Sequence, residues 1–258
     1  MREEAQPKSE QTLLRIGAVC AIAGAVVSVA AGIGFGNLTN ESAAEPVLRY
    51  ISSRPHWYWP TVHLGFILGA LLWVGALTAL ASSLANGAGR ALGRLGAASV
   101  IVGATIHIVD SSVNGFGLTV LANAWSAAPM SEQVSLLRVG DMLIRILGGT
   151  WASVVSYFHG LPFVLFGLAV VLNRSYPAWL GWVGFVGGAG SLASGVMMFL
   201  SVGLVPGRLY IAFALVVSVW MVAMGVLMWR RAGAARNGEP MLEREEQTSN
   251  TLDEEALS

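Results

Sequence analysis

Six long apolar segments restrict the folds open to this chain more than any other feature of its sequence. They lie at about residues 13–35, 58–84, 95–122, 143–172, 178–204 and 208–229. Each is long enough to cross a hydrocarbon core of about 30 Å at a rise of about 1.5 Å per residue. A segment inside a bilayer must satisfy its own backbone hydrogen bonds, and none of the six shows the alternation typical of a barrel strand. The sequence therefore predicts an all-α integral membrane protein, a bundle of six transmembrane helices.

The composition favours the same fold class. Of the 258 residues, 55% are hydrophobic and 12% are charged, whereas a soluble domain usually carries about 25% charged residues. The formal net charge is zero, so nothing in the sequence indicates a nucleic-acid partner, and the expected partner is the lipid bilayer. The single cysteine, Cys20, has no second cysteine to pair with and is interpreted as a small apolar side chain.

The distribution of basic residues predicts the orientation of the bundle. With the N-terminus inside, five of the fifteen Lys and Arg residues face outward: Arg49, Arg54, Arg138, Arg145 and Arg208. The other ten face inward, so the positive-inside rule places both termini in the cytoplasm. We expect a cytoplasmic segment at 1–12, a transmembrane domain at 13–231 and an acidic, disordered cytoplasmic tail at 232–258. Arg outnumbers Lys fourteen to one, a usage typical of high-GC bacterial genes, so we expect a bacterial inner-membrane protein.

The stretch "TIHIVDSSVN" interrupts the third apolar segment with polar side chains. On a helix, His107, Asp110, Ser111 and Asn114 fall on one stripe, and Ser112 lies off it. A charged group in the middle of a membrane costs at least about 2.5–3.5 kcal/mol on insertion scales. We therefore expect this stripe to face the interior of the bundle, where a functional site is the default hypothesis for such residues.

The fourth apolar segment carries a second polar face. Asp141, Arg145, Ser156 and His159 share it by the same helical geometry. Counted along the two helices, His107 and His159 lie at nearly the same depth, whereas His63 in the second segment is about 10 Å shallower. The predicted site is a polar column between the third and fourth helices. Its base is His107, Asp110 and His159, its upper part is His63 and Asn114, and its outer rim is Asp141 and Arg145.

Several kinds of chemistry fit these residues. Paired His107 and His159 are typical axial ligands of a haem b, and His63, His107, His159 and Asp110 are candidate ligands of a divalent metal. Alternatively, Asp110 and His107 act as catalytic acid and base on a lipid or isoprenoid. The leading hypothesis is the binding of a cofactor (haem or metal) or of a small hydrophobic ligand, with His63 and Asn114 among the binding residues. A transporter, a homo-oligomer, and a structural or assembly protein remain open. In the last of these the polar residues only pack the helices, with His107 hydrogen-bonded to Asp110 through one helical turn and His159 hydrogen-bonded to a serine.

Three further features predict local structure. Residues 131–146 read as an amphipathic helix on the outer surface that continues into the fourth span. Pro162, three residues after His159, is expected to kink that span. In the fifth span, Gly184 and Gly188 are four residues apart, which lets a neighbouring helix approach the backbone closely.

The stretch "LFGLAVVLNRSYPAWLGWVGFVGGAGSL", residues 165–192, resembles a group of uncharacterised bacterial integral membrane proteins. These share a helix that ends in a short basic turn, followed by Pro-x-Trp-Leu-Gly and a glycine-rich helix. The stretch "RIGAVCAIAGAV" at Arg15 is similar to their first span. The resemblance implies a small polytopic plasma-membrane protein and supplies no catalytic residues.

Overall fold

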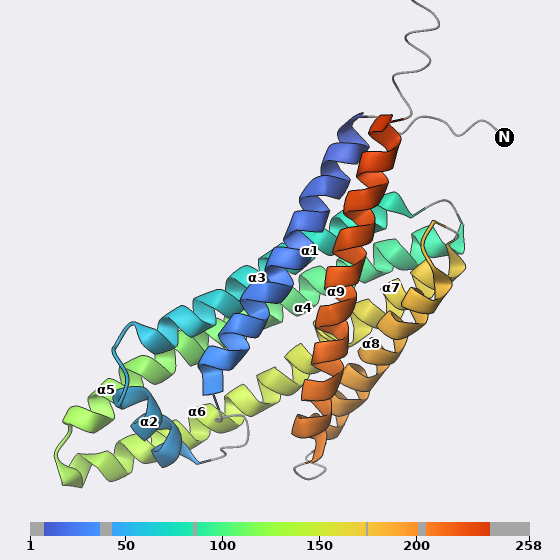
Figure 1. Cartoon of the computed structure of the whole chain (residues 1–258). Helices are drawn as coiled ribbons and strands as arrows, with labels where there is room; N and C mark the ends of the chain where they lie inside the picture. The colour runs from blue at the N-terminus through green and yellow to red at the C-terminus, as the bar shows by residue number, and fades with distance from the viewer. Residues whose placement is uncertain (1–7, 37–42, 85–86, 174, 201–204, 238–258) are drawn as a thin grey trace, which may run out of the picture.

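The computed structural model of the chain describes residues 8–36, 43–84, 87–173, 175–200 and 205–237. All of its regular structure in these ranges is helical, with no strand, which confirms the all-α fold class (Figure 1). The elements are α1 (Lys8–Phe35), α2 (Ala44–Ser52), α3 (Tyr58–Ser83), α4 (Ala88–Ser112), the π-helical turn η2 (Val113–Gly117), α5 (Leu118–Ala127), α6 (Met130–Tyr157), α7 (Leu161–Leu172), α8 (Ala178–Phe199) and α9 (Val205–Asn237).

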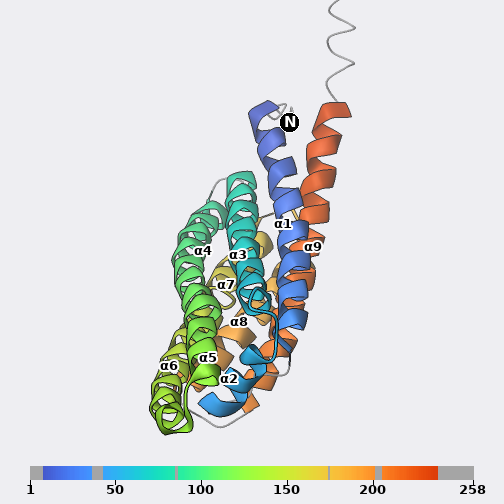
Figure 2. The ribbon, with the colours of Figure 1, turned by 90° about the vertical axis from the view of Figure 1, so that its left-hand side faces the viewer.

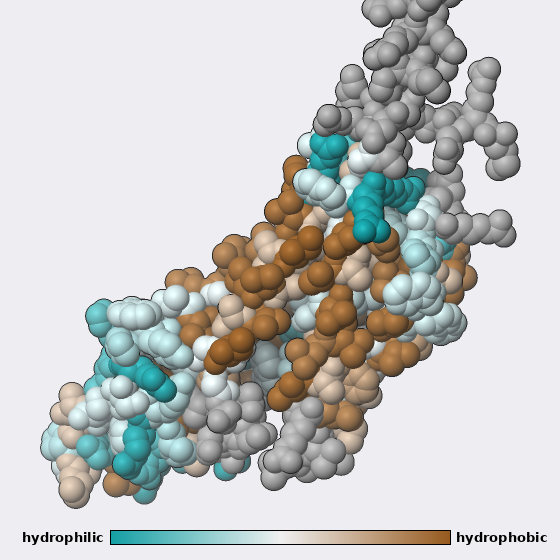
Figure 3. Space-filling view, in the orientation of Figure 1, coloured by the Kyte–Doolittle hydropathy of each residue, from teal (hydrophilic) through white to brown (hydrophobic). Residues whose placement is uncertain are grey.

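Within the described residues, six helical stretches are long and apolar enough to cross a membrane. They are Ser9–Phe35, Tyr58–Ser83, Ala88–Ala127, Met130–Leu172, Ala178–Phe199 and Leu209–Gly233. Apolar side chains such as Ile33, Leu64 and Val219 are more than half exposed on the outside of the bundle. Figure 3 shows a broad apolar surface across the middle of one face, with hydrophilic residues gathered toward its two ends. These features make the chain a multi-pass membrane protein in contact with lipid.

The third and fourth spans are longer than the sequence predicts. They contain 40 and 43 residues, whereas about 20 residues suffice to cross a bilayer. The third consists of α4, η2 and α5 in one continuous rod, and the fourth consists of α6 and α7. The predicted surface helix at 131–146 is the first half of α6 and is continuous with the rest of that helix. At one end of the molecule, α5 and α6 therefore form a hairpin that reaches beyond α1 and α3 (Figures 1 and 2).

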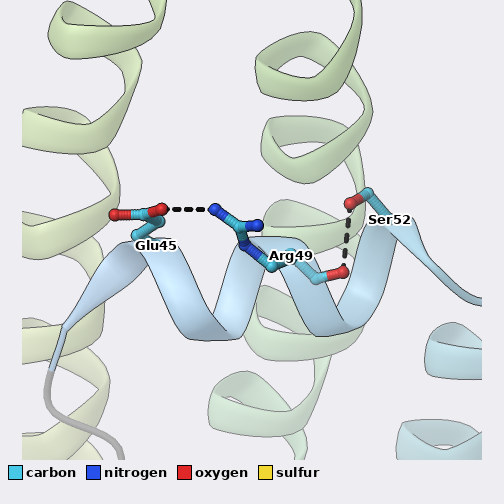
Figure 4. A network of polar contacts seen from close by, with 3 residues as sticks. All are labelled: Glu45, Arg49 and Ser52. Carbon is cyan, nitrogen blue, oxygen red and sulfur yellow. Dashed lines mark hydrogen bonds and ion pairs between the residues drawn. The ribbon is translucent and has the colours of Figure 1, made fainter.

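The short helix α2 packs on this hairpin. Its Leu48 and Ile51 belong to an apolar cluster with Leu118 of α5 and Leu147 of α6. Its first backbone N–H, that of Ala44, donates a 2.8 Å hydrogen bond to Oδ1 of Asp141 on α6. Figure 4 shows two polar contacts within α2. The guanidinium of Arg49 pairs with the carboxylate of Glu45 at 2.5 Å, and the backbone carbonyl of Arg49 accepts a hydrogen bond from the hydroxyl of Ser52. The exposed pair contributes little, so the apolar cluster and Asp141 hold α2 in place.

Glycines bring α8 close to three other helices, which confirms that the fifth span is a packing surface. A Cβ at Gly184 would meet the ring of Trp220 on α9, and a Cβ at Gly188 would lie 2.5 Å from the backbone nitrogen of Val164 on α7. A Cβ at Gly195 would lie 2.8 Å from the backbone carbonyl oxygen of Ala152 on α6. Larger side chains at these positions would push the helices apart.

The N-terminal end of α1 and the C-terminal end of α9 lie at the same end of the molecule, as an even number of spans requires (Figures 1 and 2). α9 continues to Asn237, six residues beyond the predicted end of the transmembrane domain at residue 231. α1 begins at Lys8, inside the predicted cytoplasmic segment. The remainder of that segment, 1–7, and the acidic tail from 238 onward lie outside the described residues.

Candidate functional site

The polar stripe of α4 faces the interior as predicted. His107, Asp110 and Ser111 are buried, with 3%, 4% and 2% of their surface exposed. Ser112 lies off the stripe and is exposed, and its hydroxyl donates a 2.7 Å bond to the carbonyl of Ile108 on its own helix. The helical period thus places these four residues correctly.

The fourth member of the stripe, Asn114, lies in the π-helical turn η2. The wider turn frees the Asn114 carbonyl oxygen, which accepts a 3.1 Å bond from the indole nitrogen of Trp59 on α3. Gly115 lies against His63, because a Cβ there would be only 2.7 Å from the Cβ of His63. The side-chain oxygen of Asn114 is buried without a hydrogen-bond partner. Turns of this kind are frequent at functional sites.

His159 lies in a break in the fourth span. α6 ends at Tyr157 and α7 begins at Leu161. The N–H of Phe158 and that of His159 both donate to the carbonyl of Val154, at 2.9 and 3.3 Å. Pro162 occupies the first turn of α7, where its missing N–H costs no helical hydrogen bond. The kink predicted at Pro162 is therefore confirmed as a complete break.

Two glycines hold this break between neighbouring helices. A Cβ at Gly103 of α4 would lie 2.7 Å from the Cα of Phe158. A Cβ at Gly160, inside the break, would lie 2.8 Å from the Cα of Leu192 on α8. The irregular backbone is thus enclosed by α4 and α8, in agreement with the rule that irregular backbone at membrane depth is buried in protein.

The imidazoles of His107 and His159 lie side by side, as their equal depth predicts. Their ring centroids are 6.1 Å apart and the ring planes are nearly perpendicular, at 79°. The hydroxyl of Tyr210 on α9 is 3.4 Å from Nδ1 of His159, within hydrogen-bond distance. Packing alone was expected to pair His159 with a serine, and the structure pairs it with this tyrosine instead.

The ring of Phe158 is stacked with two other rings. One is the imidazole of His107, with centroids 5.2 Å apart and planes at 14°. The other is the indole of Trp73 from α3, at 5.7 Å and 22°. The ring of His159 meets the edge of this stack, 4.8 Å from Phe158. We call Trp73, Phe158 and His107 the aromatic stack.

Two buried polar atoms of the aromatic stack have no hydrogen-bond partner. They are Nδ1 of His107 and Nε1 of Trp73. Such atoms are uncommon in folded proteins, and each costs about 1–3 kcal/mol. Both atoms belong to rings that are stacked with Phe158, which singles out this part of the bundle.

Asp110 is hydrogen-bonded to Thr150 on α6. The packing-only interpretation of the sequence expects a bond from His107 to Asp110 within one helical turn, and among the described residues the partner of Asp110 is Thr150 instead. The reason is that α4 and α6 pack directly against each other at this level. The carboxyl of Asp110 therefore contributes to the contact between two spans.

His63 lies one ring away from His107. Its Nδ1 donates a 3.0 Å bond to the carbonyl of Trp59, so that nitrogen carries the proton. The ring of Phe66 contacts both imidazoles, with centroids 5.9 Å from His63 and 6.0 Å from His107. His63 is thus a neighbour of the site that is linked to His107 through Phe66.

The predicted outer rim is not part of the site. Asp141 accepts the hydrogen bond from the first N–H of α2, and Arg145 is exposed on α6. The sequence places both on the face of His159 by assuming one straight helix from 141 to 159. The break after Tyr157 removes that relationship.

The predicted four-residue metal site is not assembled. Within the described part of the chain, no group of three or more His, Cys, Asp or Glu side chains is close enough to hold a metal ion. The ring of Phe66 contacts both His63 and His107, and Asp110 is hydrogen-bonded to Thr150. Axial ligation of a haem needs a wide flat space for the porphyrin beside both imidazoles. In this structure aromatic rings are packed around His107 and around His159, those of Phe66, Trp151, Phe158, Trp73 and Tyr210.

Sequence reasoning missed four residues of the site: Thr150, Trp73, Phe158 and Tyr210. Thr150 is a polar residue within an apolar run, a signal of the same kind as that of Ser111, but it lies on a different face of α6 from Ser156. The aromatic residues resemble ordinary core side chains in the sequence. Only the packing of α3, the helix break and α9 brings their rings together.

Comparison of the chain with protein-family models, with curated proteins and with solved structures finds no match to any of them.

Proposed function

We propose that this protein binds a small, lipid-soluble molecule within the bilayer, at the site formed by His107, Asp110, His159 and the aromatic stack. Support comes from the clustering of two imidazoles and a carboxyl group at one level of an apolar bundle. Groups of this kind are costly inside a membrane unless they serve a function. We further propose a bacterial inner-membrane location with both termini in the cytoplasm, which the count of basic residues supports.

The observation that carries this proposal is the pair of unpartnered atoms, Nδ1 of His107 and Nε1 of Trp73. A bound molecule with a hydrogen-bonding group would satisfy them. The surroundings favour an apolar molecule, because the rings of Phe66, Trp151 and Phe158 surround His107. A site of apolar walls with a few polar atoms is the usual composition of a small-molecule site.

The test is to purify the protein in mild detergent and to identify co-purifying small molecules by mass spectrometry. We expect one hydrophobic compound in stoichiometric amount, and its loss from His107→Leu. Ser112→Ala is the matched control, because Ser112 lies on the same helix and points outward. Equal small-molecule content in the wild type, His107→Leu and Ser112→Ala proteins would contradict the proposal.

A second candidate function is acid–base catalysis on a lipid or isoprenoid by Asp110 and His107. The observation in its favour is that both groups are buried one helical turn apart, beside a histidine from another span. Asp110→Asn keeps the size of the side chain and its contact with Thr150 while removing the acid. If the co-purifying compound accumulates in Asp110→Asn protein and is replaced by a modified form in the wild type, catalysis is supported over binding alone.

A further inference from the structure

We propose that the first half of α6 binds an anionic phospholipid at the membrane surface, through Arg138 and Arg145. This part of α6 belongs to the hairpin at the end of the molecule away from the two chain termini (Figures 1 and 2). The lipid site is separate from the buried His107 site and does not rest on the function proposed for that site.

Arg138 and Arg145 form an exposed basic stripe on α6. They are seven residues apart, which is nearly two helical turns and about 10 Å along the axis, so both point to the same side. Among the described residues, neither guanidinium has an ion-pair partner. Asp141 lies between them in the sequence, but its carboxylate accepts the N–H of Ala44 on α2. The stripe therefore carries two uncompensated positive charges.

An apolar stripe adjoins the basic one. Val139, Met142 and Ile146 are each more than half exposed, and their spacing of three and four residues places them on one side of α6. Exposed apolar side chains beside arginines are typical of a helix in contact with the membrane surface. The apolar stripe suits an acyl chain and the basic stripe suits a phosphate, a combination that a phospholipid offers and a soluble anion does not.

Two hydrogen bonds fix the depth of Arg145. Asp110 on α4 is bonded to Thr150 on α6, so these two residues lie at one level. Asn114 lies four residues further along the rod of α4, and its carbonyl accepts the indole N–H of Trp59. Five residues back along the antiparallel α6 from Thr150 is Arg145, which therefore lies near the level of Trp59.

That level is the edge of the membrane. The span of α3 begins at Tyr58, and the neighbouring Trp57 is more than half exposed. Aromatic residues at the end of a span are typical of the headgroup region. On α6 and α7, no residue from 146 to 173 is Asp, Glu, Lys or Arg. Arg145 is thus the last charged residue before the hydrocarbon, and Arg138 lies further out, toward the headgroups.

The chemistry of the stripe favours an anionic headgroup. A guanidinium binds phosphate oxygens through two parallel N–H bonds, and it does so better than an ammonium group. A phosphatidylcholine headgroup also carries a phosphate, but its own cation cancels the charge. A lipid with net negative charge, such as phosphatidylglycerol, complements the two positive charges of the stripe.

The experiment is native mass spectrometry of the detergent-solubilised protein, mixed with equal amounts of dioleoylphosphatidylglycerol and dioleoylphosphatidylcholine. These lipids have the same acyl chains and differ in net charge. We expect the wild type to retain phosphatidylglycerol in preference, and Arg138→Gln/Arg145→Gln to retain one molecule fewer. Each single variant should bind phosphatidylglycerol about fivefold more weakly, the contribution of one basic residue near an anionic surface. The single variants decide the matter if the double variant does not fold.

Arg49→Gln/Arg54→Gln is the matched control, because it removes the same charge from the same end of the molecule. Both of these arginines already have partners. Arg49 pairs with Glu45, and the guanidinium of Arg54 lies over the rings of Tyr50 and Tyr58. This control should retain as much phosphatidylglycerol as the wild type does.

Three results would overturn the lipid site. The first is equal retention of the two lipids by the wild type. The second is equal retention of phosphatidylglycerol by the Arg138/Arg145 variants and the control. The third is displacement of phosphatidylglycerol from Arg138 and Arg145 by millimolar inorganic phosphate, which would show that a free anion satisfies the stripe without acyl chains.

Discussion

Thr150 on α6 is hydrogen-bonded to the carboxyl group of Asp110 on α4, and this part-buried contact joins two membrane spans through residues that are 40 positions apart in the sequence. It lies near the level at which the fourth span breaks and His159 meets His107. The carboxyl group that sequence reasoning assigns to catalysis thus also has a structural partner. Any functional test at Asp110 has to be separated from this contact.

Replacement of Thr150 by valine should destabilise the protein. Thr150→Val keeps the volume of the side chain but leaves Asp110 buried without its partner, at a cost of about 1–3 kcal/mol. Thr150→Ser retains the hydroxyl and should lose much less. Tm in detergent is the measurement, and Thr105→Val is the control, because Thr105 is exposed and its hydroxyl donates to the carbonyl of Ile101 on its own helix. Equal Tm values for Thr150→Val and the wild type would show that the contact contributes nothing.

Gly103→Ala should disturb the helix break. The added methyl group would lie 2.7 Å from the Cα of Phe158, so α4 and the break must move apart. Overpacking of this kind costs about 1–3 kcal/mol. Gly148→Ala on α6 is the control, since a Cβ there meets nothing within 4 Å and should be neutral or slightly stabilising. The measurement is Tm of the two variants in detergent. Equal Tm values for Gly103→Ala and Gly148→Ala would contradict the close approach of α4 to Phe158.

The purified protein should show no Soret band and no stoichiometric metal. Aromatic rings are packed around both His107 and His159, where a porphyrin would need space, and the four residues considered as metal ligands are not gathered around one point. The measurements are a visible spectrum and elemental analysis of protein purified without chelators. A Soret band that disappears in both His107→Leu and His159→Leu would restore the haem hypothesis and would require a different arrangement of Phe158.

Tyr176, at the other end of the bundle, should make stability depend on alkaline pH. It lies in the connection between α7 and α8, outside the membrane spans, and its hydroxyl is 2.7 Å from that of Ser83. Burial raises the pKa of the Tyr176 phenol above its ordinary value of 10.0, and the Ser83 hydrogen bond and the Arg231 guanidinium partly oppose this.

Because the folded state holds this proton more tightly than the unfolded state, its stabilising effect is fully present below pH 10.0. It is lost as the pH rises from there through the folded-state pKa. Between about pH 9 and pH 11, Tm of the wild type should therefore fall further than that of Tyr176→Phe. Tyr50→Phe is the control, and parallel curves for the wild type and Tyr176→Phe would refute the prediction.

The fold could be predicted in outline because its determinants are local. Apolar length alone identifies six spans, since each span meets the cost of burying its backbone by its own hydrogen bonds. The helical period alone turns His107, Asp110 and Ser111 inward and Ser112 outward. Counting residues along two helices was sufficient to predict that His107 and His159 lie at the same depth, which agrees with the contact between their rings. These inferences need no knowledge of which helices are neighbours.

Errors begin where a helix is not regular. The π-helical turn at Val113–Gly117 changes the register beneath Asn114, and the break after Tyr157 detaches His159 from the face of Asp141 and Arg145. Pro162 indicated a disturbance in the fourth span. It did not show that the helix would stop completely and restart, because that depends on the close approach of Gly103 and Gly160 to their neighbours.

By itself, the sequence determined that this chain is an all-α membrane protein with buried histidines and a carboxyl group in its third and fourth spans, because hydrophobic length and helical period are properties of single segments. Only the tertiary structure decided the partners of those residues. It joined Asp110 to Thr150 and stacked Phe158 with both His107 and Trp73, and it left a buried nitrogen of each of these two rings unpaired. Such choices depend on which helices pack together and how closely, and that is a property of the whole bundle.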